Sequence, residues 1–212
     1  MPDDERASSA AKANTEYWDR QAPTYDTRTT FLERRYFAGC RRWVCERARG
    51  RTLEVAVGTG ATFPYYSRDV ELTGVDASGV MVGLARRRAE QRGLRVDLRQ
   101  AEAAALPFPA GNFDTVVIMF GLCCVPEVRA ALHEAVRVLR PEGNLLLADH
   151  VVSTSWPLRI LQHAVDLVTV PRQGEHYARR PLTVLRTLDV DIVESERLTR
   201  GIIERVHART SR

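Results

Sequence analysis

The chain has 212 residues, of which 44% are hydrophobic and 27% are charged, and its formal net charge is +4. This composition excludes a disordered protein and fits one globular domain. The longest uncharged apolar run, residues 115–125, is too short to cross a bilayer, and residues 1–16 carry acids without an apolar core. We therefore expect neither a membrane span nor a signal peptide.

The cysteines and the basic residues indicate a compartment and exclude one class of partner. Four cysteines in a chain of this length do not make a disulfide scaffold, and no Cys-x-x-Cys pair suggests zinc. We expect a reduced, cytoplasmic protein without a metal. Lys12 is the only lysine, and the arginines are spread among 27 acids without a dense basic block. Mixed surface charge, with no nucleic-acid partner, is the expectation.

The first 50 residues contain two segments of different character. Residues 1–14 are rich in Ala, Ser and charged side chains, and we expect them to form a mobile tail. Between residues 30 and 50, apolar side chains recur at helical spacing opposite an arginine-rich face, which predicts an amphipathic helix. Its aromatic residues would allow peripheral contact with an anionic membrane. Packing of the apolar stripe against the core is the favoured alternative.

From residue 51 onward, strand-like runs alternate with helical stretches. The clearest helix is 126–140, where Pro126 fits the first turn and Gly143 follows the end. The strand-like runs are 52–57, 71–75, 96–99, 115–119 and 144–148. This alternation predicts a parallel sheet covered by helices on both faces, with any ligand at the carboxyl ends of the strands.

After residue 150 the pattern changes. Residues 155–170 and 181–188 read as helices, and 191–198 and 201–208 read as extended runs that form an antiparallel pair. The predicted fold is therefore α/β: a doubly wound, mostly parallel seven-stranded sheet with an antiparallel C-terminal strand pair.

The most informative motif is the glycine turn after the first strand. A buried strand carries Glu54 and then turns through Gly58 and Gly60 into a helical stretch, and Asp76 ends the second strand. Such glycines allow close backbone approach to a ligand, and a carboxylate at the end of the second strand can accept both ribose hydroxyls of a nucleoside. The combination predicts a nucleoside-binding site.

The residue pattern of this turn differs from that of a dinucleotide-binding turn. The third small residue of the dinucleotide fingerprint is replaced by Phe63, which Pro64 follows. The sequence instead resembles the class I S-adenosylmethionine-dependent methyltransferases, whose first motif reads acid-x-Gly-x-Gly-x-Gly. Glu54, Gly58 and Gly60 match that motif, and Ala56 stands where the first glycine is usual.

The resemblance extends over about residues 17–150, in the same order. Residues 101–108 and 112–114 resemble the family's acid-Ala-x-x-Leu-Pro-Phe segment and its following Phe-Asp, and 139–143 resembles a Leu-x-Pro-Gly-Gly turn. Residues 17–26 resemble the opening of the ubiquinone/menaquinone-type and bacterial phospholipid N-methyltransferases, which folds over the cofactor. The resemblance implies a Rossmann-like fold.

The resemblance also implies a cofactor, a set of binding residues and a division of the chain. The cofactor would be S-adenosylmethionine, with S-adenosylhomocysteine as product. The implied binding residues are Tyr25, Glu54, Ala56, Gly58, Gly60, Asp76, Ala77, Met81, Glu102, Ala103 and Met119. Residues 15–212 would form one methyltransferase domain: a helical lid at 15–50, a cofactor-binding core at 51–150, an acceptor cap at 151–190 and closing strands at 191–212.

Candidate residues on the acceptor side follow the fourth and fifth strands. His150 is the candidate catalytic residue, as a general base, and a hydrogen-bonded structural histidine is the alternative. Cys123 and Cys124 have no local cation or base that would activate a thiol, so small apolar lining is favoured over a nucleophile. His133 belongs to the 126–140 helix and is not expected to take part.

These observations predict methyl transfer from S-adenosylmethionine to a small-molecule or lipid-like acceptor. One alternative is a nicotinamide-dependent reductase on a related sheet, against which the 63–64 departure and the absence of a Tyr-x-x-x-Lys pair argue. Another is a non-catalytic nucleoside-binding interaction module, against which Asp76 and Glu102 argue. The residues predict no particular acceptor atom and no oligomeric state.

Overall fold

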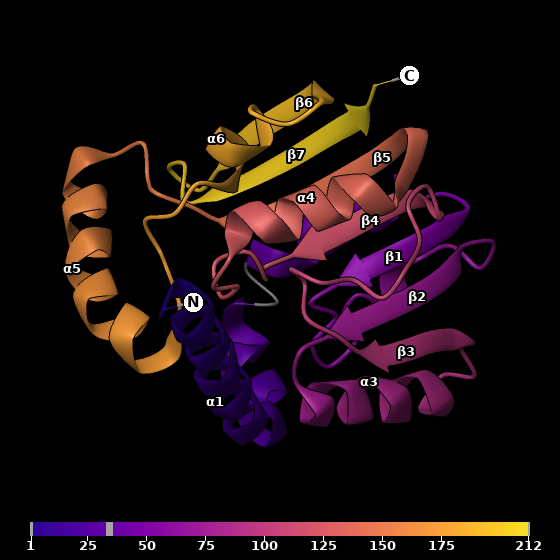
Figure 1. The fold of residues 1–212 in the computed structure, drawn as a ribbon, viewed down its shortest axis with the longest axis horizontal. Coiled ribbons are helices and arrows are strands. Elements are labelled where there is room, and N and C mark those ends of the chain that lie inside the picture. The colour runs from indigo at the N-terminus through magenta and orange to yellow at the C-terminus, as the bar shows by residue number, and fades with distance from the viewer. Residues whose placement is uncertain (1, 33–35, 212) are drawn as a thin grey trace.

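The computed structural model describes residues 2–32 and 36–211. Seven strands form one sheet in the order β3-β2-β1-β4-β5-β7-β6 (Figure 1). The strands are β1 (Arg51–Val55), β2 (Glu71–Asp76), β3 (Val96–Gln100), β4 (Phe113–Met119), β5 (Leu139–His150), β6 (Val190–Leu198) and β7 (Ile203–Thr210). The predicted fold class is confirmed.

Helices connect these strands and lie on both faces of the sheet. They are α1 (Pro2–Leu32), α2 (Ala38–Cys45), α3 (Gly79–Gln91), α4 (Val128–Val138), α5 (Trp156–Gln173) and α6 (Pro181–Leu185), with a 3-10 turn, η2, at Phe63–Tyr65. Within the described residues, no helix combines the length and the apolar character that crossing a membrane requires.

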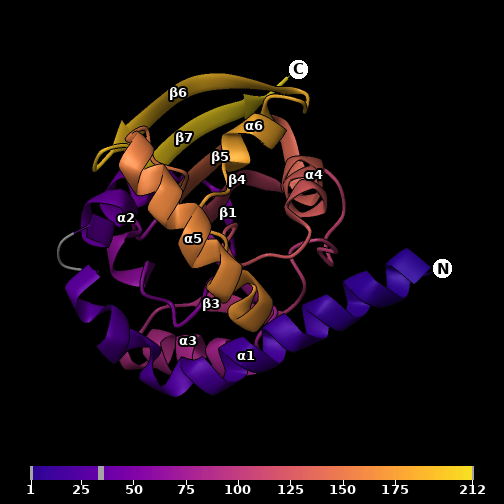
Figure 2. The same ribbon diagram turned by 90° about the vertical axis from the view of Figure 1, so that its left-hand side faces the viewer.

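The pairing of the strands matches the predicted mixture of directions. β3, β2, β1, β4 and β5 are parallel neighbours. β7 pairs antiparallel with both β5 and β6, which confirms the antiparallel C-terminal pair. The carboxyl ends of the five parallel strands therefore meet at one edge, where α1 and the C-terminal end of α5 lie (Figures 1 and 2).

Alternation along the central strands produces a two-sided core. In β4, Val116 and Ile118 belong to the apolar cluster that contains α4, whereas Val117 and Met119 belong to the cluster that contains α2. Successive strand residues point to opposite faces, so a strand buried on both sides is apolar throughout. This burial fixes the sheet that carries the site.

Residues 2–14 of the segment expected to be a mobile tail are helical and belong to α1. Its alanines and its Lys12 have high helix propensity, which favours the helix. A tertiary contact holds it as well: Asn14 Nδ2 donates to the carbonyl oxygen of Cys124 at 2.8 Å. Composition alone does not reveal such a contact.

The single helix expected between residues 30 and 50 is also corrected. α1 ends at Leu32, and α2 spans Ala38–Cys45, while Arg34 and Arg35 of the expected polar face lie outside the described residues. The apolar side chains Cys40, Trp43 and Val44 pack in the cluster on the α2 face of the sheet. Core packing, not membrane contact, therefore accounts for this stripe.

Candidate active site

The turn after β1 is fixed by one buried carboxylate. Asp76, the last residue of β2, accepts hydrogen bonds from the backbone N–H of Gly58 at 2.8 Å and of Ser78 at 2.9 Å. Burial raises the pKa of Asp76 to about 6, although these two N–H donors act in the opposite direction. Asp76 thus connects the glycine turn to the residue that caps α3.

Ala56 has a left-handed backbone, which explains why glycine is usual at this place. Its φ is 56°, a region that costs an L-residue about 1–2 kcal/mol. A Cβ added at Gly121, in the loop after β4, would lie 2.6 Å from the Ala56 Cβ. Gly121 therefore makes room for the alanine, and the two positions form a matched pair.

Gly60 shapes the turn and does not line the cleft. Its φ is 75°, and an added Cβ would lie 2.4 Å from the ring of Phe63. Phe63 is buried beside the turn. Phe63, the residue that departs from the dinucleotide fingerprint, therefore fills the space next to Gly60. Its ring leaves no room for a side chain at position 60.

Glu54 supports the turn from below. Its carboxylate accepts from Thr62 Oγ1 at 2.6 Å and from Tyr66 Oη at 3.1 Å, and the side chain is buried. Burial raises the pKa of Glu54 to about 7, against the opposing effect of its hydrogen bonds and of Arg41. The hydroxyl donors satisfy the carboxylate, which holds the loop that follows the glycine turn.

A cleft of about 880 Å³ opens above this turn. Ten of the eleven predicted cofactor-binding residues line it, and Gly60 is the exception. Those ten are Tyr25, Glu54, Ala56, Gly58, Asp76, Ala77, Met81, Glu102, Ala103 and Met119.

The N-terminal helix closes one side of the cleft. Trp18 and Tyr25 of α1 lie in its lining, with their rings edge to face and 6.1 Å apart. Two carboxylates of the same helix secure it: Asp19 accepts from Ser78 Oγ at 2.5 Å, and Asp26 accepts from Thr59 Oγ1 at 2.7 Å. Ser78 also donates to Asp76, and Thr59 follows Gly58, the other donor to Asp76. The two carboxylates of α1 are therefore attached where Asp76 is bound.

Several lining residues were not identified from the sequence. They include Asn14, Trp18, Arg41, Thr59, Ala61, Phe120 and Gly121, whereas Cys124 lines the cleft as expected. The spacing of 14, 18, 22 and 25 is that of one helical face, and Ala22 is buried. A helical interpretation of residues 1–25 would have found this face.

The polar atoms of the cleft fit a nucleoside with an amino-acid tail. Asn14 Oδ1 and Trp18 Nε1 line the cleft, are buried, and have no hydrogen-bond partner among the described residues. Such atoms need a partner, since burying them without one is costly. Asp76 and Glu102 add carboxylates, and Met81 and Met119 add apolar surface. The donor and acceptor set matches S-adenosylmethionine.

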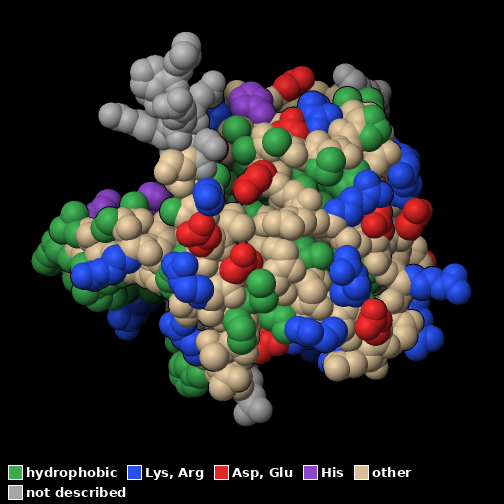
Figure 3. Space-filling model, turned by 60° about the horizontal axis from the view of Figure 1, so that its bottom comes forward, with side chains coloured by type: hydrophobic (Ala, Val, Ile, Leu, Met, Phe, Trp, Pro, Cys, Tyr) green, Lys and Arg blue, Asp and Glu red, His purple; other side chains and the backbone are tan. Residues whose placement is uncertain are grey.

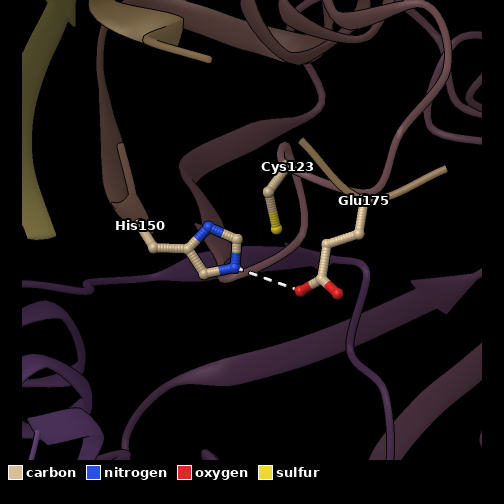
Figure 4. A group of neighbouring side chains, drawn as sticks. All are labelled: Cys123, His150 and Glu175. Carbon is tan, nitrogen blue, oxygen red and sulfur yellow. Dashed lines mark hydrogen bonds and ion pairs between the residues drawn. The ribbon is translucent and has the colours of Figure 1, made fainter. Parts of the chain in front are cut away.

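A second cluster consists of Cys123, His150 and Glu175 (Figure 4), and Cys123 Sγ lies 3.4 Å from the Sγ of Cys124, which lines the cleft. His150, at the end of β5, has Nε2 3.3 Å from Glu175 Oε1, and its ring stacks on Tyr177 with centroids 4.8 Å apart. Asp149 Oδ1 lies 3.7 Å from the other ring nitrogen. His150 itself does not line the cleft.

The charges around His150 favour its protonated form. Burial disfavours that form most strongly, but the hydrogen bond to Glu175 and the charges of Asp149 and Glu175 outweigh it, so the pKa of His150 is raised. The ring can therefore hold a proton that it takes from a neighbouring group. No sequence motif pointed to Glu175, because it follows α5 and reaches His150 only in the fold.

Cys123 completes this cluster. Its Sγ and the ligand atoms of His150 and Glu175 lie within 4.8 Å of one another, and these donor types occur at zinc sites. The sequence predicted no metal, since the three residues come from separate segments. Burial raises the pKa of the Cys123 thiol well above its usual range, which agrees with the prediction of a neutral, non-nucleophilic side chain.

Comparison with known proteins identifies the group to which the chain is similar. A family model described as "Methyltransferase domain" matches residues 53–147. The chain is 42% identical over 118 residues to a phosphatidylethanolamine N-methyltransferase of Cereibacter sphaeroides, an alignment that covers 55% of this chain and 58% of that relative. It is 34% identical over 169 residues to a demethylmenaquinone methyltransferase of Renibacterium salmoninarum, covering 77% of this chain and 70% of the relative.

A solved structure supports the fold. A SAM-dependent methyltransferase of Thermotoga maritima superposes with a TM-score of 0.69 at 21% identity, covering 92% of this chain and 99% of the other. In contrast, the chain spans less than two thirds of the length of the Cereibacter relative. The sequence and fold comparisons agree with the resemblance that the motifs carried.

The matched pair of Ala56 and Gly121 gives a prediction about stability. Ala56→Gly should raise the free energy of unfolding by about 0.5–1 kcal/mol, because glycine accepts the left-handed backbone. Gly121→Ala should lower it by about 1–3 kcal/mol through overpacking, and should cost much less in the Ala56→Gly background. Urea unfolding of the wild-type protein, the two single variants and the double variant measures these free energies. Equal costs of Gly121→Ala in both backgrounds would show that the two positions are independent.

Proposed function

The chain belongs to the class I S-adenosylmethionine-dependent methyltransferases, and we propose that it transfers the methyl group of this cofactor to a small-molecule or lipid-like acceptor. The observation that carries the proposal is the cleft in which Gly58 and Asp76 face two residues of α1, Trp18 and Tyr25. Asp76 would hold the ribose hydroxyls, Glu102 the adenine, and α1 would cover both.

When bound, S-adenosylmethionine supplies a methyl group on a positively charged sulfur. The protein's part is to hold donor and acceptor in line and to exclude water, and alignment of this kind supplies effective molarities of roughly 10⁵–10⁸ M. Met119, Phe120 and Cys124 line the end of the cleft next to the His150 cluster, with Arg41 over the Phe120 ring and Asn14 hydrogen-bonded to Cys124. The acceptor enters here, next to the cluster of His150.

His150 and Glu175 would take up the proton that an amine, hydroxyl or thiol acceptor loses. His150 is the proposed base, and Glu175 is a positioning residue that acts through the 3.3 Å hydrogen bond to Nε2. Tyr177 fixes the plane of the ring by stacking. Support for the pair comes from its place beside Cys123, whose Sγ lies 3.4 Å from the Sγ of the cleft-lining Cys124.

Ligand binding tests the proposed cofactor. S-adenosylhomocysteine should raise the melting temperature, whereas NAD(H) should not. Asp76→Asn should weaken binding by about 1.5–3 kcal/mol, the scale of a hydrogen bond to a charged group. Because the pKa of Asp76 is about 6 and the carboxylate is the accepting form, the affinity of the wild-type protein should fall as the pH drops through 6.

The control for this experiment is Asp97→Asn, which changes an exposed carboxylate that pairs with Arg99 on β3. Titration calorimetry from pH 5 to pH 8 compares the affinity for S-adenosylhomocysteine of the wild-type protein, Asp76→Asn and Asp97→Asn. If Asp76→Asn binds with wild-type affinity and pH dependence, Asp76 is not part of the site. If NAD(H) stabilises the protein instead, the proposed function is wrong.

The proton-accepting pair predicts a pH profile. Turnover should rise with pH through a midpoint above the usual histidine value of about 6.5, because only the neutral ring accepts a proton. His150→Gln should lower turnover about 10²–10⁴-fold without changing cofactor affinity. Glu175→Gln removes a group that raises the pKa of His150, so its midpoint should move to lower pH.

The acceptor for these assays comes from a panel of amine, hydroxyl, thiol, quinone and phospholipid compounds, with methylated product read by mass spectrometry. His133→Gln, on an exposed position of α4, is the matched control and should behave as wild type. A melting temperature that falls in His150→Gln while turnover per folded molecule is kept would make this histidine structural. Activity that EDTA removes and Zn²⁺ restores would instead assign the Cys123 cluster to a metal.

A further inference from the structure

The apolar side chains of α5 point outward. At about 100° per residue, its eight most closely grouped apolar positions fall within an arc of about 140°. They are Trp156, Pro157, Ile160, Leu161, Ala164, Leu167, Val168 and Pro171, and all are exposed. Leu167 is 79% exposed, Trp156 69% and Ile160 62%. Figure 3 shows hydrophobic side chains gathered on the lobe at the left, where Figure 1 places α5.

Three polar side chains of the same helix, Gln162, Asp166 and Thr169, point inward and hold the chain segments beside it. Gln162 accepts from the Ser153 N–H at 2.7 Å, and Asp166 accepts from the Tyr177 N–H at 2.7 Å. Thr169 donates to the carbonyl oxygen of Glu175 at 2.9 Å. A surface helix ordinarily buries its apolar face, so α5 is inverted, and such a face indicates an apolar partner.

The size of the face argues against a second copy of the chain as that partner. α5 has 18 residues and is about 27 Å long, so its apolar arc offers on the order of 300 Å². A stable protein interface needs about 800 Å² from each partner. A bilayer has no such minimum, because a helix that lies in the interface buries its apolar face among acyl chains.

The charges of α5 fit an anionic bilayer. Its exposed charged side chains are Arg159 and Arg172, and Asp166, its one acid, is turned inward by its hydrogen bonds. At about 100° per residue, Arg172 lies just beyond one edge of the apolar arc and His163 lies just beyond the other. Arginine side chains near an anionic membrane surface are attracted to it.

We propose that the outer face of α5 docks on the surface of an anionic lipid bilayer and brings the acceptor side of the cleft to that surface. The chain after α5 carries Glu175 and Tyr177 to His150, and Gln173 at the end of α5 accepts from Tyr17 Oη of α1 at 2.5 Å. The helix that touches lipid is thus connected to both sides of the site: to α1 through Gln173, and to His150 through the residues that follow the helix. The inference rests on the proposed function in one respect, because it takes the methyl acceptor to be lipid-like.

Flotation with vesicles tests the docking surface. The full chain should float with vesicles of phosphatidylcholine containing phosphatidylglycerol, and more weakly with phosphatidylcholine alone. Leu167→Glu should weaken the binding by about tenfold or more, since it replaces the most exposed apolar side chain of the face. Val193→Glu, at a 55% exposed position of β6, makes the same type of change elsewhere and should bind as wild type.

Three results overturn the proposal. Wild-type protein that stays with the soluble fraction has no docking face, and equal loss in Val193→Glu places the binding elsewhere. A dimer that Leu167→Glu dissociates, without vesicle binding, makes a second copy the partner. Unchanged melting temperatures of both variants establish that they fold. Vesicle binding without methyl transfer to any acceptor would contradict the proposed function and leave the docking surface intact.

Discussion

The candidate site depends on the buried carboxylate of Asp76 and its two backbone donors. A buried carboxylate is stable only when hydrogen-bonded, and Gly58 and Ser78 supply both bonds. These bonds fix the turn after β1 relative to the first turn of α3. Ser78 in turn caps α3 through the Met81 N–H and donates to Asp19 of α1. One carboxylate therefore organises the floor of the cleft and the place where α1 attaches.

The two helices beside the cleft are attached differently from the core helices. α4 buries five apolar side chains against the sheet, whereas α5 buries none. α1 is held by Asn14, Asp19 and Asp26, and α5 by Gln162 and Asp166, so polar contacts carry much of both attachments. Segments with few buried apolar contacts open at lower free energy than the core. Under the proposed function, this division would let substrates enter while the sheet keeps its packing.

Ten of the residues that line the cleft were implied by the resemblance to the methyltransferase family. Alternating apolar runs and one glycine turn were enough to predict the sheet, its antiparallel closing pair and a nucleoside site at the turn. Local periodicity and turn chemistry determine these features. The helical character of residues 2–14 was missed because composition suggested a tail, whereas Asn14 and Cys124 meet only in the fold. The place of Glu175 beside His150 was missed for the same reason.

Ala56 shows a further limit of motif reading. The family pattern favours glycine at this place, and the sequence gives no indication that Gly121, which follows β4, compensates for the alanine. Compensation of this kind involves backbone angles and a close approach between two loops, so it is visible only in three dimensions. The inverted face of α5 is similar, because periodicity identifies an apolar stripe without saying which way it points.

The central claim is that the cleft between the Gly58 turn and α1 holds the methyl donor. A crystal structure of the protein with S-adenosylhomocysteine tests it most directly. The account predicts ribose hydroxyls within hydrogen-bond distance of the Asp76 carboxylate, with Trp18 and Tyr25 covering the ligand. A ligand bound elsewhere, or a cleft that stays without ligand at saturating concentration, would contradict it.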